Sequence, residues 1–233
     1  MTAPASQLRT YSRADVVSFR STKERFGGLS NMAPGFPLLV NGVEIRTSEA
    51  LYQACRFPNL PDVQRMIIEE KSPMTAKMLS KPYRGQSRPD WLAVRVKIMR
   101  WCLRLKLAQN WQTFGELLYA SSESPIVEDS RKDDFWGAKA DEDGNLVGQN
   151  ILGRLLMELR DHLRSPKGNE LRTVPLPNIK DLLLYGEPIT YQEISEGPFP
   201  EEREDMQPAV MTAPQSETQK SGTCSSVRSP GRS

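Results

Sequence analysis

The sequence predicts an α+β fold that is predominantly α-helical. Apolar residues recur at helical spacing in several segments, most clearly in residues 148–163, whereas a single strong hairpin signal lies at residues 38–45. Apolar residues make up 38% of the 233, and the apolar runs stop near residue 190. We therefore expect one compact domain with a small β-hairpin, followed by a polar tail.

The composition divides the chain into four segments. Residues 1–14 are polar, and we expect them to be flexible. Residues 15–165 carry the periodic elements and form the domain, and residues 166–195 are expected to pack on it as a C-terminal extension. Residues 196–233 are rich in Pro, Ser, Thr, Gln and Glu with few apolar residues, which predicts a disordered tail.

The first third of the domain is expected to contain short strands and one helix. Residues 16–19 suit a short strand, and residues 38–45 suit a hairpin because Asn41-Gly42 tolerates the positive φ of a tight turn. Residues 47–57 suit a helix, since hydroxyl residues and an acid precede a run of good helix formers.

Four more helices are expected further along the chain. Prolines open the segments 61–71 and 72–79, and a proline is well suited to the first turn of a helix. The longest predicted helix covers residues 89–109, and the most clearly amphipathic one covers residues 148–163. Residues 128–148 are predicted to form a long polar loop.

The cysteine spacing and the targeting signals indicate in which cellular compartment the protein works. The three cysteines, Cys55, Cys102 and Cys224, lack any Cys-x-x-Cys spacing, which argues against a structural zinc site and favours a reducing compartment. The sequence shows neither a secretion signal nor an apolar run that could span a bilayer. A cytoplasmic location and no membrane contact are therefore expected.

The single histidine restricts the chemistry. His162 lies near the end of an amphipathic helix, where a histidine usually faces solvent. Histidine-based triads and histidine-rich metal sites are therefore unfavourable, and neither a metal nor a cofactor is expected. If the protein is an enzyme, carboxylates, with or without a lysine, must carry its chemistry.

Two acidic segments are candidates for that chemistry. Glu49 lies in the first turn of a predicted helix, where it either offsets the helix dipole or serves as a catalytic carboxylate. Residues 128–137 place several acids beside Trp136, so that a ring can stack on a base while a carboxylate handles a proton. The alternative is a solvated loop that Phe135 and Trp136 anchor.

Basic segments offer candidates for phosphate binding. The glycine-containing segment 20–31 and the segment 81–91, in which basic residues alternate with Tyr83 and Trp91, suit a phosphate or a stacked base. Charged surface loops of this kind are also common. Lys106 shares a semi-apolar helix face, from which it either reaches water or acts as a partly desolvated, nucleophilic amine.

Taken in order, several blocks of residues 18–164 resemble the NADAR superfamily, also described as YbiA-like. They read FRSTKERFGGLSN, NGVEIRTSEALYQACRF, SPMTAKM, MRWCLRLKLAQ, IVEDSRKDDFWGAK and GQNILGRLLMELR. The resemblance implies a compact α-rich fold with N-glycosidase activity. One branch of the family cleaves ribosylated pyrimidine phosphates of the riboflavin pathway, and another removes ADP-ribose from guanine in nucleic acid, reversing DarT-like transferases.

The resemblance also implies the residues of the site. Glu49 matches the essential glutamate, expected to orient water or contact the ribose hydroxyls, and Asp133 matches an acid expected to handle a proton or position the sugar. Lys106 matches a recurrent lysine that could form an adduct with the opened sugar. The expected substrate-binding residues are Trp91, Trp136, Arg20, Lys23, Asn31, Lys81, Arg84, Gly137 and Asn150.

Two departures from the small-molecule branch favour the guanine branch. Ala50 follows Glu49 where that branch has a histidine, and an acidic insert, DEDGN, follows residues 136–139. The expected partners are ADP-ribosylated single-stranded nucleic acid or an ADP-ribosyl guanine nucleotide, and a DarT-like transferase toxin that the protein would counteract as an antitoxin. A riboflavin-pathway N-glycosidase and a non-catalytic module that binds ADP-ribose or NAD are the alternatives.

Overall fold

The computed structural model describes residues 8–190 and confirms an α+β fold that is mainly helical. Six α-helices lie within these residues, together with four short 3-10 helices and a few small sheets. The predicted disordered tail, residues 196–233, lies outside the described residues, as do residues 1–7 and 191–195.

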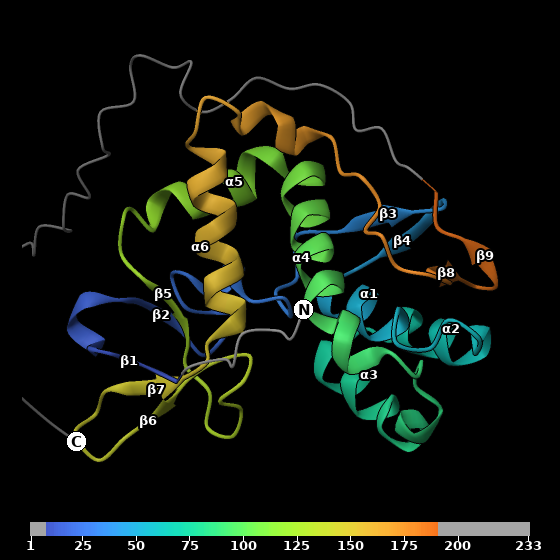
Figure 1. The fold of residues 1–233 in the computed structure, drawn as a ribbon, viewed down its shortest axis with the longest axis horizontal. Helices are drawn as coiled ribbons and strands as arrows, with labels where there is room; N and C mark the ends of the chain where they lie inside the picture. Colours follow the sequence, from blue (N-terminus) through green and yellow to red (C-terminus); the bar gives the residue numbers. More distant parts are fainter. Residues whose placement is uncertain (1–7, 191–233) are drawn as a thin grey trace, which may run out of the picture. The chain divides into compact units, whose positions relative to one another are not determined.

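The helices form the larger part of the domain (Figure 1). The longest, α4, contacts α1, α5 and α6, so that it is the central element of the helical part. The six α-helices are α1 (Ser48–Ala54), α2 (Pro61–Glu69), α3 (Pro73–Leu79), α4 (Trp91–Gln109), α5 (Trp111–Ala120) and α6 (Ile151–Leu163). The 3-10 helices are η1 (Arg13–Asp15), η2 (Gly27–Leu29), η3 (Lys81–Gln86) and η4 (Gly168–Arg172).

The strands are short and form four separate sheets. Two are the antiparallel hairpins β3–β4 and β8–β9, a third is the parallel pair β2–β5, and the fourth has the strand order β1-β7-β6. The bounds are β1 (Arg9–Tyr11), β2 (Val17–Phe19), β3 (Leu38–Val40), β4 (Val43–Ile45), β5 (Ile126–Glu128), β6 (Lys139–Ala140), β7 (Leu146–Gly148), β8 (Leu183–Leu184) and β9 (Glu187–Pro188).

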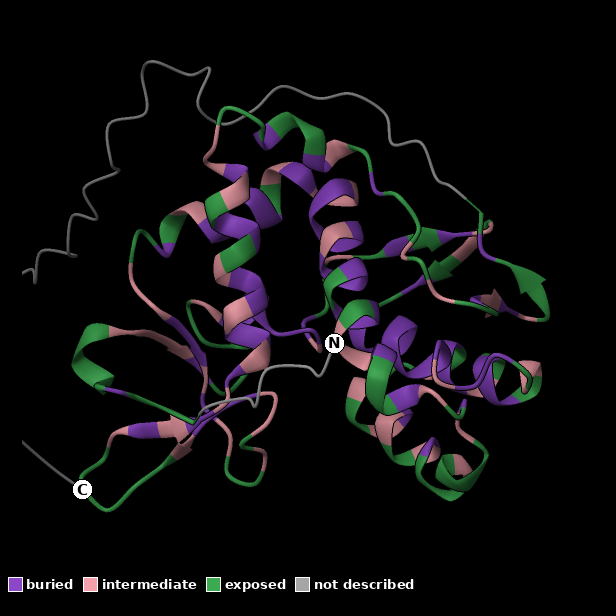
Figure 2. Cartoon of the chain, viewed as in Figure 1, coloured by how far each residue is buried: buried purple, intermediate pink, exposed green. Residues whose placement is uncertain are grey.

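A large apolar core holds the helices together, and a second, small cluster packs the sheet of β1, β7 and β6. Buried residues line α1, α4, α5 and α6, whereas the loop between β6 and β7 is mostly exposed (Figure 2). Leu51, Leu103, Phe114 and Leu156 are almost completely removed from water. Each such side chain contributes about 1.5–3 kcal/mol to folding, so the core fixes the positions of the helix ends that carry polar groups.

The local signals read from the sequence explain the two best-predicted elements. Asn41 and Gly42 adopt φ values of 49° and 76°, which the tight turn between β3 and β4 requires. The Thr47 hydroxyl accepts a hydrogen bond of 3.2 Å from the backbone N–H of Ala50 and caps α1. The expected hairpin and helix start are therefore confirmed.

The structure differs from the sequence-based expectations in three places. Residues 9–11, expected to be flexible, form β1 against β7, because Tyr11 packs with Val127 and Leu146. The segment 128–148, expected to be a polar loop, ends in β6 and β7. Helix α5 was not expected; it starts immediately after α4, where Asn110 leaves the helical conformation.

The described part of the C-terminal extension packs on the domain. Leu171, Val174, Leu184 and Ile189 are buried in the same core as the helices. Gln64 of α2 connects the extension to the domain through polar contacts, because its side chain donates to the carbonyl of Leu183 over 2.9 Å. No helix among residues 8–190 combines the length and the apolar character needed to cross a membrane.

Candidate active site

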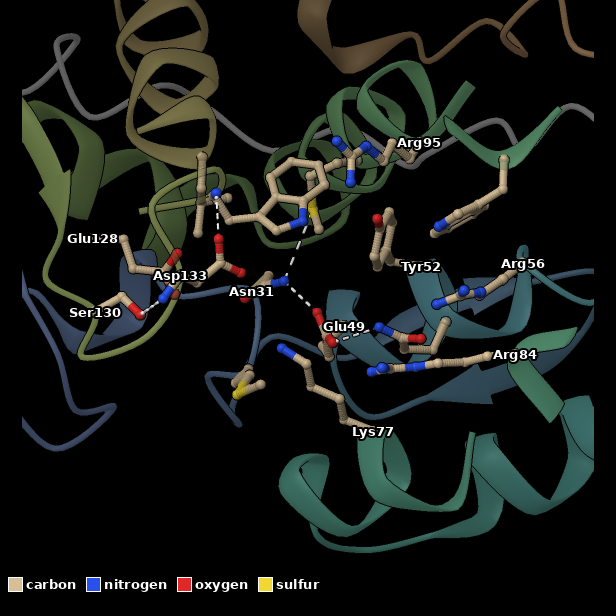
Figure 3. A pocket seen from close by; sticks show the side chains of 16 residues that line it. Asn31, Glu49, Tyr52, Arg56, Lys77, Arg84, Arg95, Glu128, Ser130 and Asp133 are labelled. Atoms are coloured by element: carbon tan, nitrogen blue, oxygen red, sulfur yellow. Dashed lines mark hydrogen bonds between the residues drawn. The ribbon is translucent and has the colours of Figure 1, made fainter. Parts of the chain in front are cut away.

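Polar side chains from segments far apart in the sequence line a cavity of about 320 Å³ (Figure 3). Its walls come from α1, α3, α4 and η3, from the residues after η2, from the segment after β5 and from the first turn of α6. The lining residues are Asn31, Met32, Glu49, Tyr52, Gln53, Arg56, Lys77, Arg84, Trp91, Arg95, Met99, Glu128, Ser130, Asp133, Trp136 and Leu152.

Helical spacing explains why two helices contribute several residues each. Residues three and four apart share a helix face, so Glu49, Tyr52 and Gln53 line the cavity from the same face of α1. In the same way, Trp91 and Arg95 lie on one face of α4. Once one residue of such a face belongs to a site, its helical neighbours belong to it too.

Glu49 is buried at the start of α1, with only 2% of its surface exposed. Its carboxylate accepts a hydrogen bond from the side-chain amide of Asn31 and another, of 2.9 Å, from the amide of Gln53. The backbone carbonyl of Asn31 accepts from the N–H of Glu49 over 2.9 Å, so both ends of this residue are fixed. Burial raises the pKa of Glu49, and the nearby charge of Lys77 opposes that rise.

Lys77 of α3 supplies a positive charge among the acids of the cavity. Its charge lowers the pKa of both Glu49 and Glu128, which places its ammonium group near both carboxylates. No acidic partner within ion-pair distance of this ammonium is present in the described part of the chain. Lys77 can therefore stabilise an ionised carboxylate or an anionic ligand.

Glu128 ends β5 and lines the cavity beside Ser130 and Asp133. Burial is the main cause that raises the pKa of its carboxyl to about 7; the charge of Lys77 opposes the rise, and the charges of Asp133 and Glu49 add to it. Such a carboxyl is partly protonated at neutral pH. A group of this kind is typical of acid–base sites.

Asp133 has a more conventional environment. One of its oxygens accepts the backbone N–H groups of Phe135 and Trp136, each over 2.9 Å. This arrangement is an Asx turn, which fixes the loop that carries Trp136. The carboxylate of Asp133 therefore organises one wall of the cavity and faces the other acids across it.

An aromatic wall lies next to the acids. The ring centroid of Tyr52 lies 5.0 Å from that of Trp91 and 5.6 Å from that of Trp136. Phe135 supports Trp136 from behind in an edge-to-face contact of 5.1 Å. The rings bury one another and leave a surface on which a planar base can stack.

Three arginines gather on the other side of the cavity (Figure 3). Arg56 lies over the ring of Trp91 at 5.2 Å, and Arg95 lies over Phe135 at 3.7 Å. Burial lowers the pKa of Arg56, and the positive charges of Arg84 and Arg95 lower it too. No described carboxylate forms an ion pair with any of the three, so this side of the cavity suits an anion.

The cavity thus brings together six of the residues that the sequence singled out. They come from five separate stretches of the chain, and each faces the same space. The six are Glu49, Asp133, Trp91, Trp136, Asn31 and Arg84.

Lys106 lies elsewhere, in the core beneath the cavity, and is not among its lining residues. Its ammonium nitrogen donates to the carbonyls of Gly28, over 2.6 Å, and Ser30, over 2.8 Å. The rings of Phe36 and Phe114 lie 4.5 and 4.4 Å from it. Burial holds its pKa well below the ordinary value. The structure thus gives Lys106 contacts that position the backbone leading to Asn31.

Three predicted basic residues also lie outside the cavity lining. Arg20 pairs with Asp129 at 2.9 Å, so its charge is already compensated by a carboxylate. Lys23 is exposed in the loop after β2. Lys81 is exposed on η3, the same short helix that carries Arg84 into the cavity.

Gly137 and Asn150 act on the backbone around Glu128. A Cβ atom at Gly137 would lie 2.4 Å from the carbonyl oxygen of Glu128, so only glycine fits there. Asn150, at a φ of 48°, donates its side-chain amide to the carbonyl of Ile126 over 2.8 Å and accepts the N–H of Glu128 over 3.2 Å. Both residues hold β5 in place and do not line the cavity.

Among the lining residues that the sequence analysis did not select for the site, six carry charged, amide or phenol groups. Spacing from Glu49 and from Trp91 was a usable signal for four of them, and Glu128 belongs to the acidic segment 128–137, whereas no local signal distinguished Lys77. The six are Tyr52, Gln53, Arg56, Lys77, Arg95 and Glu128. Ala50, whose identity separated the two branches, is buried in the core and does not line the cavity.

The described residues do not contain a group of three or more histidine, cysteine or acidic side chains arranged to hold a metal ion. Lys77 stands among the three carboxylates of the cavity, where its charge interacts with Glu49 and Glu128.

Comparisons with known proteins identify the family of the chain. Residues 18–164 match the NADAR domain model. The N-glycosidase YbiA of Escherichia coli is 33% identical over 168 residues, which is 72% of this chain and all of YbiA. A riboflavin biosynthesis protein of Vibrio vulnificus, VVA0006, is 34% identical over 148 residues, covering 64% of this chain and 38% of that protein.

A solved structure shows the same fold. The NMR structure of Escherichia coli YbiA has a TM-score of 0.53 and 32% identity, and the match covers 66% of this chain and 88% of that one. The sequence match and the fold match agree. The chain therefore belongs to the NADAR domain family of glycosidase-type enzymes.

Proposed function

We propose that the protein is an N-glycosidase that hydrolyses the bond between ADP-ribose and a guanine base in nucleic acid. One observation carries the proposal: a single cavity joins buried carboxylates to an aromatic wall and to three arginines without acidic partners. A ribosyl group between a base and phosphates needs all three surfaces. Such a substrate arises from an ADP-ribosyltransferase that modifies guanine, so a transferase of that class is the proposed biological partner.

The acids suit the reacting sugar. Cleavage of an N-glycosidic bond develops positive charge on the ribose, which a preorganised carboxylate stabilises electrostatically. Glu49 is held by Asn31 and Gln53 from two directions, so its carboxylate does not have to reorganise during the reaction. In the proposed mechanism Glu49 faces the sugar and orients the attacking water.

The remaining surfaces suit the rest of the substrate. Trp91, Trp136 and Tyr52 provide the rings on which a guanine base stacks, an interaction worth roughly 1–3 kcal/mol per base. Arg56, Arg84 and Arg95 suit the diphosphate of ADP-ribose, because guanidinium groups bind phosphate oxygens through paired hydrogen bonds.

The rim of the cavity favours a nucleic acid over a free nucleotide. Arg84 is exposed where η3 meets the cavity, and Lys81 extends the positive charge along the same helix away from it. A phosphodiester backbone that leaves the cavity would pass such charges. The base must be unpaired to enter, so the proposed substrate is single-stranded or has an extruded base.

A second candidate function rests on a named relative. The Vibrio vulnificus protein is described as a riboflavin biosynthesis protein, and the region that matches this chain is 34% identical. A ribosylated pyrimidine phosphate also combines a base, a ribose and a phosphate. This candidate predicts cleavage of the small substrate and no preference for nucleic acid.

Direct comparison of substrates separates these functions. The protein is incubated with a single-stranded oligonucleotide ADP-ribosylated on guanine and, in parallel, with a ribosylated pyrimidine phosphate. The proposal predicts free ADP-ribose and an unmodified oligonucleotide, both measured by chromatography and mass spectrometry. An oligonucleotide that stays modified while the pyrimidine substrate is cleaved establishes the second candidate. Binding of ADP-ribose without cleavage of either substrate identifies a non-catalytic module.

A further inference from the structure

We infer that Glu128 is the catalytic acid that protonates the departing base. The inference rests on the proposed N-glycosidase function and reassigns the proton-handling role expected for Asp133. It follows from the hydrogen bonds of the three cavity carboxylates, from the way the backbone holds Glu128, and from the charges around it.

The three carboxylates differ in how their oxygens are occupied. Both oxygens of Glu49 accept side-chain amide N–H groups, from Asn31 and Gln53. One oxygen of Asp133 accepts two backbone N–H groups. These bonds occupy acceptor sites on both oxygens of Glu49 and on one oxygen of Asp133. Among the residues that the structure describes, none donates a hydrogen bond to the Glu128 carboxyl, so its oxygens remain available to a ligand.

The backbone of Glu128 is held on both sides. Its N–H donates to the side-chain oxygen of Asn150, and its carbonyl accepts the N–H of Ala138 over 2.8 Å. Gly137 packs against that same carbonyl without a side chain between them. A side chain on so rigid a strand end keeps a fixed direction into the cavity, as an acid that meets one substrate atom requires.

Burial, together with two neighbouring acids, keeps the Glu128 carboxyl partly protonated at neutral pH. The groups that act on it are Lys77 from α3, Asp133 from the loop after β5 and Glu49 from α1. Burial and the two acids raise the pKa of Glu128 to about 7, although Lys77 opposes them. An acid whose pKa lies near the working pH is both protonated and able to release its proton.

The proposed step conserves atoms and charge. The bond between C1′ of the ribose and the base nitrogen breaks, and its electron pair stays on the nitrogen, which takes the proton of Glu128. The cation at C1′ is stabilised by Glu49 and captured by water, whose oxygen forms the new bond. Glu49 accepts the proton that the water loses and releases it to solvent, and Glu128 takes a proton back from solvent.

Glu128→Gln tests the inference because glutamine keeps the shape of the side chain and cannot donate an acidic proton. The variant should lower kcat about 10²–10⁴-fold on the substrate that the wild type cleaves. It should also remove the loss of kcat/KM that the wild type shows as the pH rises through about 7. Affinity for ADP-ribose, measured by calorimetry, should change less than about threefold, since the proposal gives Glu128 no role in holding the phosphates.

Two controls make the result specific. Glu142→Gln, in the exposed loop between β6 and β7, should leave the rate and the pH profile unchanged. A substrate analogue whose leaving group departs without a proton should be cleaved by Glu128→Gln at nearly the wild-type rate, whereas a merely structural defect would slow both substrates equally. A variant with wild-type kcat, or one that keeps the alkaline loss of activity, overturns the inference.

A measurement without substrate keeps the test independent of the proposed function. Carbon-13 NMR of glutamate side-chain carboxyls in the wild type should show one titration near pH 7 that is absent in Glu128→Gln. If the wild type cleaves neither proposed substrate while this titration is present, the proposed function fails. If Glu128 titrates in the ordinary carboxyl range, near 4.3, the inference about Glu128 fails whatever the substrate.

Discussion

The acidic side of the cavity and its cationic side are assembled in different ways. Glu49 belongs to α1, whereas Glu128 ends β5 and Asp133 follows in the next loop, far along the chain. The cationic side takes Arg56, Arg84 and Arg95 from one continuous region that runs from the end of α1 into α4.

This difference suggests that the acidic side carries the chemistry and the cationic side binds the substrate. The carboxylates are buried or partly buried and depend on packing between distant segments, which fixes them relative to the reacting bond. The arginines stack on rings and carry charges that no described acid neutralises. We expect changes on the acidic side to lower kcat and changes on the cationic side to raise KM.

Glu49→Gln should have the largest effect. Loss of the carboxylate charge should reduce kcat roughly 10²–10⁴-fold, because a group that stabilises the developing cation acts mainly in the transition state. Affinity for ADP-ribose should remain, as single-turnover kinetics and calorimetry would show. Glu44→Gln on the exposed side of β4 is the matched control. Turnover at the wild-type rate would remove Glu49 from the chemistry.

Lys106→Met tests whether a residue outside the cavity takes part in the reaction. Removal of the ammonium group takes a donor from the carbonyls of Gly28 and Ser30, of which Ser30 keeps the N–H of Ala33, and an unsatisfied buried group costs about 1–3 kcal/mol. We expect a lower free energy of unfolding in urea, compared with the exposed Lys97→Met.

The same variant addresses the predicted covalent adduct. Borohydride reduction during turnover, followed by mass spectrometry, should give the same products in the wild type and in Lys106→Met. An adduct that is present in the wild type and missing in a folded Lys106→Met protein would show that Lys106 reacts with the opened sugar, against its position in the core.

Arg84→Ala should weaken binding about tenfold, since a hydrogen bond to a charged group contributes about 1.5–3 kcal/mol and part of Arg84 is exposed to water. KM should rise while kcat changes little, and the salt dependence of binding to an ADP-ribosylated oligonucleotide should become shallower. Arg9→Ala, on exposed β1, is the control. A fall in kcat with unchanged KM would contradict the division between the two sides.

Glu128→Gln should also change the free energy of unfolding. This effect is the smallest of those predicted, and it depends on pH. Burial raises the pKa of Glu128 in the folded protein to about 7. The protonated carboxyl therefore contributes its full stabilisation below the ordinary pKa of a glutamate, and this contribution is lost as the pH rises through about 7. The variant should therefore match the wild type at pH 5 and be more stable at pH 8 by about 1–2 kcal/mol. Urea unfolding at both values measures this, and an equal difference at pH 5 and pH 8 would argue against the raised pKa.

Several parts of the fold follow from local sequence. Asn41-Gly42 determines the turn of the β3–β4 hairpin, and Thr47 determines where α1 begins, because each acts through its own backbone neighbours. The amphipathic pattern of α6 and the length of α4 are equally local. Strands β1, β6 and β7 escaped prediction because each is only two or three residues long, and β1 also pairs with a strand far away in the chain.

The sequence by itself determined that Glu49 opens a helix, that Trp136 follows a cluster of acids, and that the chain has the motif order of its family. Only the tertiary structure decided which lysine lies among the acids. Lys77 lines the cavity and Lys106 lies in the core, although both are helical and their surroundings in the sequence are similar. The physical reason is that helical periodicity defines a face, whereas the packing of distant segments decides what that face meets.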